Sequence, residues 1–379
     1  DAFGAARRAR RRGLLSLARA QDSAPLPEAW PSAMAEYLRT RDAVEHSLER
    51  SNLCPLSERT AVEAELARLQ ARAAKAADEL VRLSRGQLGA AESELREPGT
   101  GEALLLWMES NDGWHGFLQF EQSVEHFHTE PRPSGKAWLE PFESTLRRAR
   151  RLSVLGLGEL NREDVHSLSS AAPDRERLYV VYSLDLSPTS RHSEKERSVI
   201  VGDTLGDLPE SSREVVRVAR NWEAAGRDVI TLLGADAQPA RIRAALRDAK
   251  ILHYAGHAHF EGPEGWGSYI PLQHARITVA DLLTWGEAPN EVVLSACDAA
   301  LEPGLPHTAG LGIAQAFVLA GARAVVAPSR RISDRAAAEF AESVSRRMSE
   351  GEDLTTAYHA VQATLARDSE ARAFRLLVR

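Results

Sequence analysis

Two short apolar runs of this chain each end in a residue that can do acid–base or nucleophilic chemistry. The run that begins at Ile251 leads to His257, and the run that begins at Val292 leads to Cys297. A cysteine attacks carbonyl carbon as its thiolate, but a free thiol has a pKa of about 8.5 and is mostly protonated at neutral pH. A neighbouring imidazole can take that proton and later protonate a leaving amine. The two residue types therefore predict a nucleophile and base pair, provided that folding brings them together.

The elements around these residues predict a parallel sheet that presents both at one edge. From Leu178 onward, runs rich in Val, Ile and Leu alternate with helical segments, a pattern typical of a sheet covered by helices on both faces. Ligand sites in such sheets form beyond the carboxyl ends of the strands, where His257 and Cys297 are expected. We expect strands at residues 179–184, 199–201, 229–233, 251–254, 292–294 and 324–327. We expect helices at residues 211–225, 239–249, 279–285, 311–320 and 334–348.

The first hundred residues have the period of helices instead. Apolar residues recur at helical spacing from Met34 to Leu48, and a narrow apolar seam runs from Val62 to Leu83. A helical hairpin is expected here, with a partner-binding coiled coil as the alternative. Turn-forming residues interrupt the pattern after residue 96. We therefore predict a helical region over 1–99 and one larger domain over 100–379.

The segments that flank this helical region have patterns of their own. The larger domain opens with β-rich runs at 103–108 and 114–120, joined by Ser110-Asn-Asp-Gly113, which is a hairpin signal. A helix is expected over 136–150. The arginine-rich run at 7–12 is expected to be a solvated, mobile terminus, with binding to an acidic partner as the alternative.

Composition narrows the functional class. The net charge of −7 and the pI of about 6.0 argue against a general nucleic-acid binder, so a protein or peptide partner is expected. Only Cys54 and Cys297 occur, too few for a disulfide framework, which indicates a reducing, cytoplasmic location. Neither a membrane-spanning run nor a secretory signal is visible. Because the chain begins with Asp1 rather than Met, it is expected to be a processed piece with domains missing upstream.

Competing chemistries have weaker support. His253, His257 and His259 could bind zinc with Cys297, but no His-Glu-x-x-His helix or paired cysteines accompany them. Phosphate-binding and serine-hydrolase motifs are absent from the sequence, and the glycines around Gly312 are better explained as a helix start packed on the sheet. We therefore expect no metal and no cofactor. His253 is expected to be a hydrogen-bonded core residue, and Cys54 to be structural or surface-borne.

Several motifs, taken in order, resemble the CHAT family of caspase-like domains within the caspase, gingipain and separase group. The resemblance covers about residues 104–377. The segments that carry it are Val201-Gly-Asp-Thr-Leu-Gly-Asp-Leu-Pro209 with Glu214, His253-Tyr-Ala-Gly-His257, Gly267-Ser-Tyr-Ile-Pro-Leu272, Val293-Leu-Ser-Ala-Cys297, Ala320-Gly-Ala-Arg-Ala-Val-Val326, Asp334, and Gly351 with Ala357. The second and fourth segments are similar to the family's catalytic His-x-Ala-x-His-Gly and Leu-Ser-Ala-Cys motifs.

The resemblance implies a Cys297–His257 dyad with an oxyanion hole formed by the backbone N–H groups of Ala258 and Cys297. Ala258 departs from the glycine that the family usually has after its catalytic histidine; alanine keeps the N–H but resists a positive φ.

Three side chains are candidates for substrate binding, namely Asp298, Ser329 and Asp334. Ser329-Arg330-Arg331 replaces the family's common Trp and Pro, so the substrate preference does not transfer. An Asp298 in the pocket favours a basic substrate residue, whereas Arg330 or Arg331 there favours an acidic one.

Together these features predict a caspase-like α/β/α sandwich with a mostly parallel sheet, preceded by an N-terminal helical region. The implied function is that of a cysteine endopeptidase that cuts a protein partner in regulated proteolysis or bacterial antiviral defence, for example a gasdermin-like or CRISPR-associated target. An upstream sensor or activator would rearrange loops at 261–269 and 299–309. The alternative is a catalytically silent CHAT module that serves as a scaffold or sensor.

Overall fold

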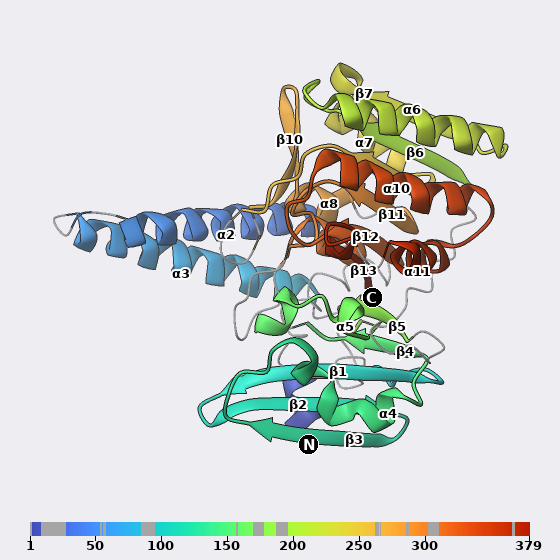
Figure 1. Cartoon of the computed structure of the whole chain (residues 1–379). Coiled ribbons are helices and arrows are strands. Elements are labelled where there is room, and N and C mark those ends of the chain that lie inside the picture. Colours follow the sequence, from blue (N-terminus) through green and yellow to red (C-terminus); the bar gives the residue numbers. More distant parts are fainter. Residues whose placement is uncertain are drawn as a thin grey trace.

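An 11-stranded sheet forms the centre of the computed structural model, in the order β3-β2-β1-β4-β5-β13-β12-β11-β8-β6-β7 (Figure 1). The structure describes residues 2–8, 28–53, 55, 58–84, 95–156, 158–169, 178–186, 196–261, 265, 267–285, 288–301, 311–365 and 368–379. The strands of the main sheet are β1 (Glu102–Ser110), β2 (Gly113–Phe120), β3 (Ser123–Thr129), β4 (Arg151–Val154), β5 (Tyr179–Ser183), β6 (Arg197–Gly202), β7 (Val229–Leu233), β8 (Ala249–Ala255), β11 (Glu291–Ser295), β12 (Ala324–Pro328) and β13 (Phe374–Val378). A separate two-stranded sheet pairs β9 (Tyr269–Leu272) with β10 (Ala275–Thr278).

The main sheet is mostly parallel, but it consists of two halves that run in opposite directions. Strands β12, β11, β8, β6 and β7 are parallel to one another. The last strand, β13, is antiparallel to β12 and parallel to β5, which continues the parallel series through β4 to β1. The hairpin strands β2 and β3 complete the far edge in antiparallel pairing. The prediction of a mostly parallel sheet is confirmed.

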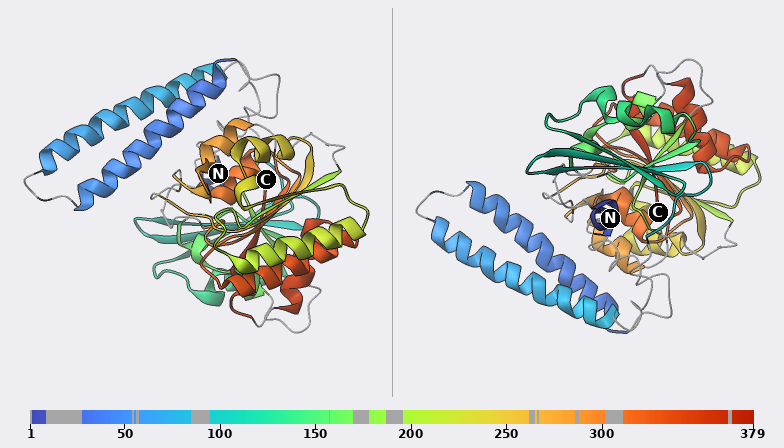
Figure 2. Two further views of the ribbon diagram at one scale, coloured as in Figure 1. Left: turned by 90° about the horizontal axis from the view of Figure 1, so that it is seen from above. Right: turned by 90° about the horizontal axis from the view of Figure 1, so that it is seen from below.

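Helices cover both faces of the sheet, which confirms the predicted α/β/α sandwich (Figure 2). Trp222, Phe340 and Tyr358 belong to the apolar cluster on one face, and Leu246, Leu283 and Phe317 to the cluster on the other. The first face carries α6 (Pro209–Ala224), α10 (Asp334–Ser349) and α11 (Leu354–Thr364), and the second carries α7 (Pro239–Leu246), α8 (Val279–Trp285) and α9 (Ile313–Leu319).

The segment at 136–150 corrects the prediction of one continuous helix. It forms two 3-10 turns, η1 (Gly135–Trp138) and η2 (Glu140–Phe142), followed by the short helix α4 (Glu143–Leu146). Pro141 lies in η2, and proline removes a backbone donor and disfavours the helical conformation in the residue before it. Further short helices that the sequence did not signal are η3 (Gly158–Arg162), α5 (Val165–Ser169), η4 (Gly234–Asp236) and η5 (Ala371–Ala373).

Helices α2 (Trp30–Leu53) and α3 (Arg59–Ser84) pack against each other as a hairpin that projects from the body (Figures 1 and 2). Val62, Ala73 and Ala76 of the predicted seam are buried in it. Met34 and Leu38 join the core cluster that contains α8, so the base of the hairpin is anchored on the body. Within the described residues, no helix combines the length and the apolar character that a bilayer crossing requires.

Arg7, the first residue of the arginine-rich run, is buried and ordered, which corrects the prediction of a solvated, mobile terminus at this residue. Residues 2–8 are helical, and the Arg7 side chain is 1% exposed. Its Nε and Nη2 atoms donate to the carboxylate of the fully buried Asp185 at 2.9 and 2.7 Å, and Nη1 donates to Gln119 at 3.0 Å. This bidentate pair ties the start of the chain to strands of the sheet. Residues 9–12 lie outside the described residues.

We predict that Arg7→Met lowers the free energy of unfolding by about 3–5 kcal/mol, because it leaves the Asp185 carboxylate buried without its countercharge. Urea unfolding followed by circular dichroism measures this loss. Arg8→Met is the matched control, since Arg8 is exposed and its replacement is expected to change stability by no more than about 0.5 kcal/mol. Equal stability of the two variants would contradict the buried ion pair.

Candidate active site

Strands β8 and β11 place His257 and Cys297 at the same edge of the sheet. The two strands pair in parallel register up to Ala255 opposite Ser295. The N–H of Gly256 then donates to the carbonyl of Ser295 at 3.1 Å, which carries the pairing one residue further. His257 and Cys297 each lie two residues beyond the last paired position of their strand. The structure therefore puts an imidazole and a thiol beyond the carboxyl ends of adjacent parallel strands.

The His257 side chain is 35% exposed and has a carboxylate partner that the sequence did not single out. Its Nε2 atom lies 3.2 Å from Oδ1 of Asp207, in the loop between β6 and α6. That loop is shaped by Asp203, whose carboxylate accepts hydrogen bonds from the Leu208 N–H and the Ser212 hydroxyl. Asp207 lies 50 residues before His257 in the chain, and its only signal was its place in the segment from 201 to 209.

Two contacts fix the backbone around His257. The hydroxyl of Tyr254 donates to the His257 carbonyl at 2.6 Å. A Cβ atom at Gly256 would lie 2.7 Å from that same hydroxyl oxygen, so only glycine leaves room for the contact. Ala258 follows, buried and without a positive φ. Alanine at this position therefore costs no backbone strain in this conformation, and among the described residues its N–H donates no hydrogen bond.

Cys297 is half-buried, and its thiol donates to the carbonyl of Ile332 at 3.4 Å. Burial raises the pKa of the Cys297 thiol, and the carboxylates of Asp298 and Asp334 raise it further. Among the described residues, no hydrogen bond joins this sulfur to the His257 imidazole, whose Nε2 contacts Asp207. The thiol is thus less acidic than a free cysteine, and its present partner is a backbone carbonyl rather than the imidazole.

The charged residues beside Cys297 pair with one another. Asp298 adopts a positive φ of 58° and its carboxylate lies 3.3 Å from Nε of Arg331. Arg330 points elsewhere, with hydrogen bonds to Asp164 and to the carbonyl of Ser369. Of the two arginines, only Arg331 lies beside Asp298, and its side chain is 88% exposed.

The two other predicted substrate-binding residues follow strand β12. Ser329 is buried, and its hydroxyl donates to the carbonyl of Ala373 at 3.1 Å. Asp334 is exposed in the first turn of α10, next to the N-cap residue Ser333. The Asp334 side chain therefore faces solvent near Cys297. The Ser329 hydroxyl instead points to a partner in the interior.

A buried polar network lies directly behind the two site strands. His253 of β8 contacts the Glu214 carboxylate through Nε2 at 2.7 Å and the Ser345 hydroxyl through Nδ1 at 2.8 Å. The hydroxyl of Ser295 on β11 donates to the other oxygen of Glu214 at 2.9 Å. Trp222 covers His253 edge to face at 6.1 Å. The expectation of a hydrogen-bonded core histidine is confirmed, and the carboxylate of one helix residue joins β8 to β11.

We predict that Glu214→Ala lowers the free energy of unfolding by at least about 2 kcal/mol, because it leaves buried groups of His253 and Ser295 without a partner. Burial also raises the pKa of Glu214, because the charged carboxylate has little contact with water there. Chemical denaturation with wild-type and variant chains gives the difference. Glu223→Ala on the same helix replaces an exposed carboxylate and serves as the control, with an expected change within about 0.5 kcal/mol.

We predict that Cys297 reacts with iodoacetamide with a pH midpoint above that of a free cysteine peptide. A raised pKa means that less thiolate is present at any pH below the midpoint. The pH–rate profile is measured on a chain with Cys54→Ser, so that only Cys297 reports. Asp334→Asn removes a carboxylate that raises the pKa, and it should move the midpoint down. A midpoint at or below the peptide's value would contradict the burial of the thiol.

These features define an α/β/α sandwich that carries a cysteine and a histidine at one edge of a parallel sheet. Comparison with protein families matches the CHAT domain to residues 6–375. The match covers nearly the whole chain, and the chain therefore belongs to the CHAT family. Membership of this family suggests a caspase-like protease.

Among solved structures, the chain is similar to two crystal structures of the separase–securin complex of Saccharomyces cerevisiae, at 2.6 and 3.0 Å resolution. The first is 12% identical with a TM-score of 0.45, and the second is 15% identical with a TM-score of 0.43. Each match covers 60% of this chain and 15% of the separase chain. No curated protein matches the sequence.

Proposed function

We propose that this chain is a cysteine endopeptidase that uses Cys297 as nucleophile and His257 as general acid and base. The observation that carries the proposal is the placement of these two residues beyond the ends of the paired strands β8 and β11. The half-buried thiol and the partly exposed imidazole both lie at the sheet edge where parallel sheets form their sites. Membership of the CHAT family supports a caspase-like protease, and the sequence segments that end in these two residues resemble the catalytic motifs of that family.

In the proposed reaction, His257 takes the proton of Cys297 and the resulting thiolate attacks the carbonyl carbon of a peptide bond. The C–S bond forms as the carbonyl π bond opens to an oxyanion. The oxyanion then collapses, the C–N bond breaks, and the imidazolium protonates the leaving amine. Water, deprotonated by His257, hydrolyses the thioester and returns the thiol.

Three further groups have proposed roles in this reaction. The Nε2–H of His257 would donate to Asp207, which leaves the lone pair of Nδ1 for the thiol proton; Asp207 is thus a positioning residue. The N–H groups of Ala258 and Cys297 would bind the oxyanion, and each such donor is worth about 3 kcal/mol in enzymes where it has been measured. No metal or cofactor takes part in this scheme.

Substrate selection is proposed to involve Asp298 and Asp334, which flank the thiol. Asp334 is exposed, whereas the carboxylate of Asp298 is held by Arg331. A basic substrate residue could displace the Arg331 guanidinium from Asp298, since that side chain is itself largely in solvent. Ser329 has an interior hydrogen bond and would contribute to this pocket through its position rather than its hydroxyl.

The resting geometry supports a protease that needs an activator. The Cys297 thiol must leave the Ile332 carbonyl before the free Nδ1 of His257 can take its proton, whereas the contact of His257 with Asp207 can stay. The helical hairpin contacts elements that hold both site segments. His46 of α2 lies 3.9 Å from Glu261, four residues after His257. The base of α2 packs on α8, α8 packs on α9, and Ala314 of α9 donates to the carbonyl of Ala299 at 3.0 Å. A sensor protein docked on the hairpin could therefore shift both site segments.

The proposed setting is regulated proteolysis or antiviral defence in a bacterial cytoplasm, with a protein substrate such as a gasdermin-like or CRISPR-associated target. This setting rests on the family resemblance, and a reducing compartment suits a nucleophilic thiol. The net charge of −7 gives no support to direct nucleic-acid binding.

An electrophilic peptide probe, combined with cleavage of a peptide library, tests the proposal. Wild-type chain and the matched control Cys54→Ala should react, whereas Cys297→Ala should not. His257→Ala is expected to react about 10²- to 10⁴-fold more slowly, since it lacks the base, and Asp207→Asn should show a smaller loss. Labelling that survives Cys297→Ala overturns the assignment of the nucleophile. A wild-type chain that neither labels nor cleaves fits both a silent scaffold or sensor module and a protease at rest, and repeating the labelling with an activator protein separates the two.

A further inference from the structure

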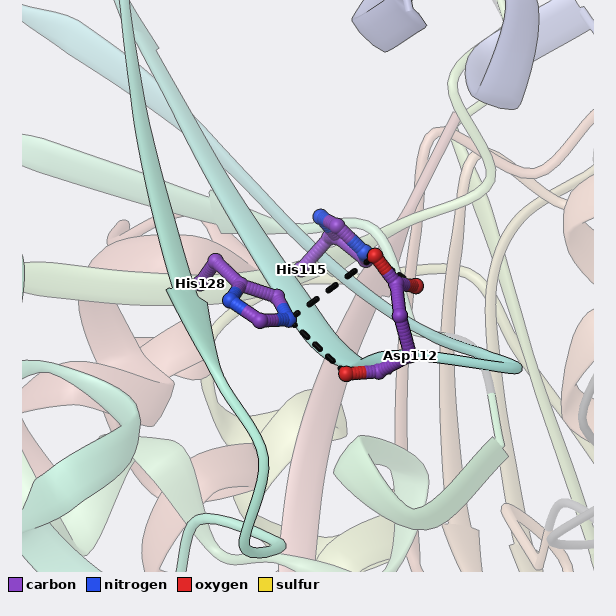
Figure 3. Close-up of side chains that lie close together, drawn as sticks. All are labelled: Asp112, His115 and His128. Carbon is purple, nitrogen blue, oxygen red and sulfur yellow. Dashed lines mark hydrogen bonds and ion pairs between the residues drawn. The ribbon is translucent and has the colours of Figure 1, made fainter.

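A cluster of histidines lies at the opposite end of the sheet from the candidate active site. His115 lies on β2, and His126 and His128 lie on the edge strand β3. Asp112 occupies the turn between β1 and β2 and completes the group (Figure 3). Five strands separate β2 from β11 in the sheet, so this cluster takes no part in the proposed proteolysis.

The register of the hairpin brings the side chains together. His115 lies directly opposite His128 across the β2–β3 pair, where facing side chains stand on the same side of the sheet. His115 Nε2 lies 3.1 Å from Asp112 Oδ1, and His128 Nε2 lies 4.0 Å from Asp112 Oδ2. One ligand atom from each of the three residues falls within 4.8 Å of the others. The three groups therefore converge on one point from two strands and a turn, as Figure 3 shows.

The backbone of the turn is shaped for this approach. Gly113 has a φ of +131°, which side chains rarely adopt. A Cβ atom there would lie 2.6 Å from the carbonyl oxygen of Thr129 and 3.1 Å from Nε2 of His128. A larger residue at 113 would therefore push β3 away and move His128 out of reach of Asp112.

We propose that Asp112, His115 and His128 bind a divalent transition-metal ion, most simply Zn²⁺. Imidazole nitrogen and carboxylate oxygen are ligands that zinc takes at about 2.0–2.2 Å in tetrahedral sites. Ligand atoms around such an ion stand a little over 3 Å apart, and the three ligand atoms now lie within 4.8 Å of one another, so binding requires them to close by up to about 1.5 Å. Three protein ligands leave the fourth position to water. Hard cations such as Mg²⁺ and Ca²⁺ prefer oxygen ligands and fit this set poorly.

His126 supports the site from behind as a second-layer residue. Its Nε2 lies 3.0 Å from Nδ1 of His115, and the two rings stack at 5.3 Å. When Nδ1–H of His115 donates to His126, the lone pair of His115 lies on Nε2, the atom that faces the metal. Metal-bound histidines almost always have such a partner on their other ring nitrogen.

Binding would connect the edge strand to the turn of the neighbouring hairpin. Strand β3 is largely exposed, including Val124 and Phe127, and it pairs on one side only. An edge strand of this kind is open to unwanted pairing and opens readily. An ion held by His128 on β3 and by Asp112 and His115 on the preceding hairpin would hold the strand in register, which is a structural role.

Titration of the metal-free full chain with ZnCl₂ by calorimetry tests the site. A Cys54→Ser, Cys297→Ala background is used so that neither thiol can serve as a ligand. The expected result is binding of one Zn²⁺ per chain, lost in His115→Ala, in His128→Ala and in Asp112→Asn. His126→Ala should weaken the affinity by about 10- to 100-fold, as other second-layer changes do. His274→Ala, which replaces an exposed histidine of the β9–β10 turn, is the matched control and should bind like the parent chain.

Thermal unfolding with and without Zn²⁺ gives an independent readout. Zn²⁺ should raise the midpoint of the parent chain and of His274→Ala, because a ligand of the folded state stabilises it, and should leave His115→Ala and His128→Ala unchanged. Circular dichroism confirms that the variants are folded. A parent chain that binds no Zn²⁺, or binding that His115→Ala and His128→Ala leave intact, overturns the proposal. Neither result depends on peptidase activity.

Discussion

The parallel pairing of β8 with β11 is the constraint on which the candidate active site depends. It sets Ala255 opposite Ser295 and thereby delivers His257 and Cys297 to one edge of the sheet. Backbone hydrogen bonds alone would allow the strands to slip, but side chains resist this. The Glu214 carboxylate binds His253 of β8 and Ser295 of β11 in the fully buried layer behind the site. A slip of one residue would break both contacts and turn each strand's side chains to the other face.

The same site is held in a resting state by local interactions. The Cys297 thiol donates to the carbonyl of Ile332, and burial raises its pKa. The Nε2 atom of the His257 imidazole contacts Asp207. Reactive groups of this kind are safest when apart, because a free thiolate is open to oxidation and to unwanted acylation. The helical hairpin, anchored by Met34 and Leu38 and in contact with the loop after His257, is the one element that reaches away from the described body.

The antiparallel junction between β12 and β13 joins this half of the sheet to a second half, which has polar interactions of its own. There the bidentate pair of Arg7 and Asp185 fixes the start of the chain, and the histidine cluster lies at the far edge. The Arg7–Asp185 pair joins segments 178 residues apart, whereas the cluster gathers residues of consecutive strands β2 and β3 and of the turn before them. The two ends of one continuous sheet thus carry different polar groups, with the proposed nucleophile at one end and the proposed metal-binding cluster at the other.

Much of the fold and part of the site could be read from local pattern. The alternation of apolar strands and amphipathic helices from Leu178 onward determined the sandwich, because burial on both faces requires that pattern. The positions of His257 and Cys297 after their strands were visible in the same way. The exposed strand β3, with no apolar alternation, and the helix interrupted at Pro141 were not recognised, because their conformation is set by neighbours and by proline sterics.

What only the tertiary structure decided is the set of partners. The sequence named a cysteine and a histidine, but it could not show that Asp207 holds the imidazole, that Ile332 holds the thiol, or that Arg7 is buried against Asp185. It also gave no sign that Asp112, His115 and His128 converge. The periodicity of apolar residues in the sequence indicates which side chains are buried, because each segment buries one face whatever its partners are. The choice of a polar partner depends on register and loop geometry between segments up to 178 residues apart, and those are fixed only when the whole sheet has formed.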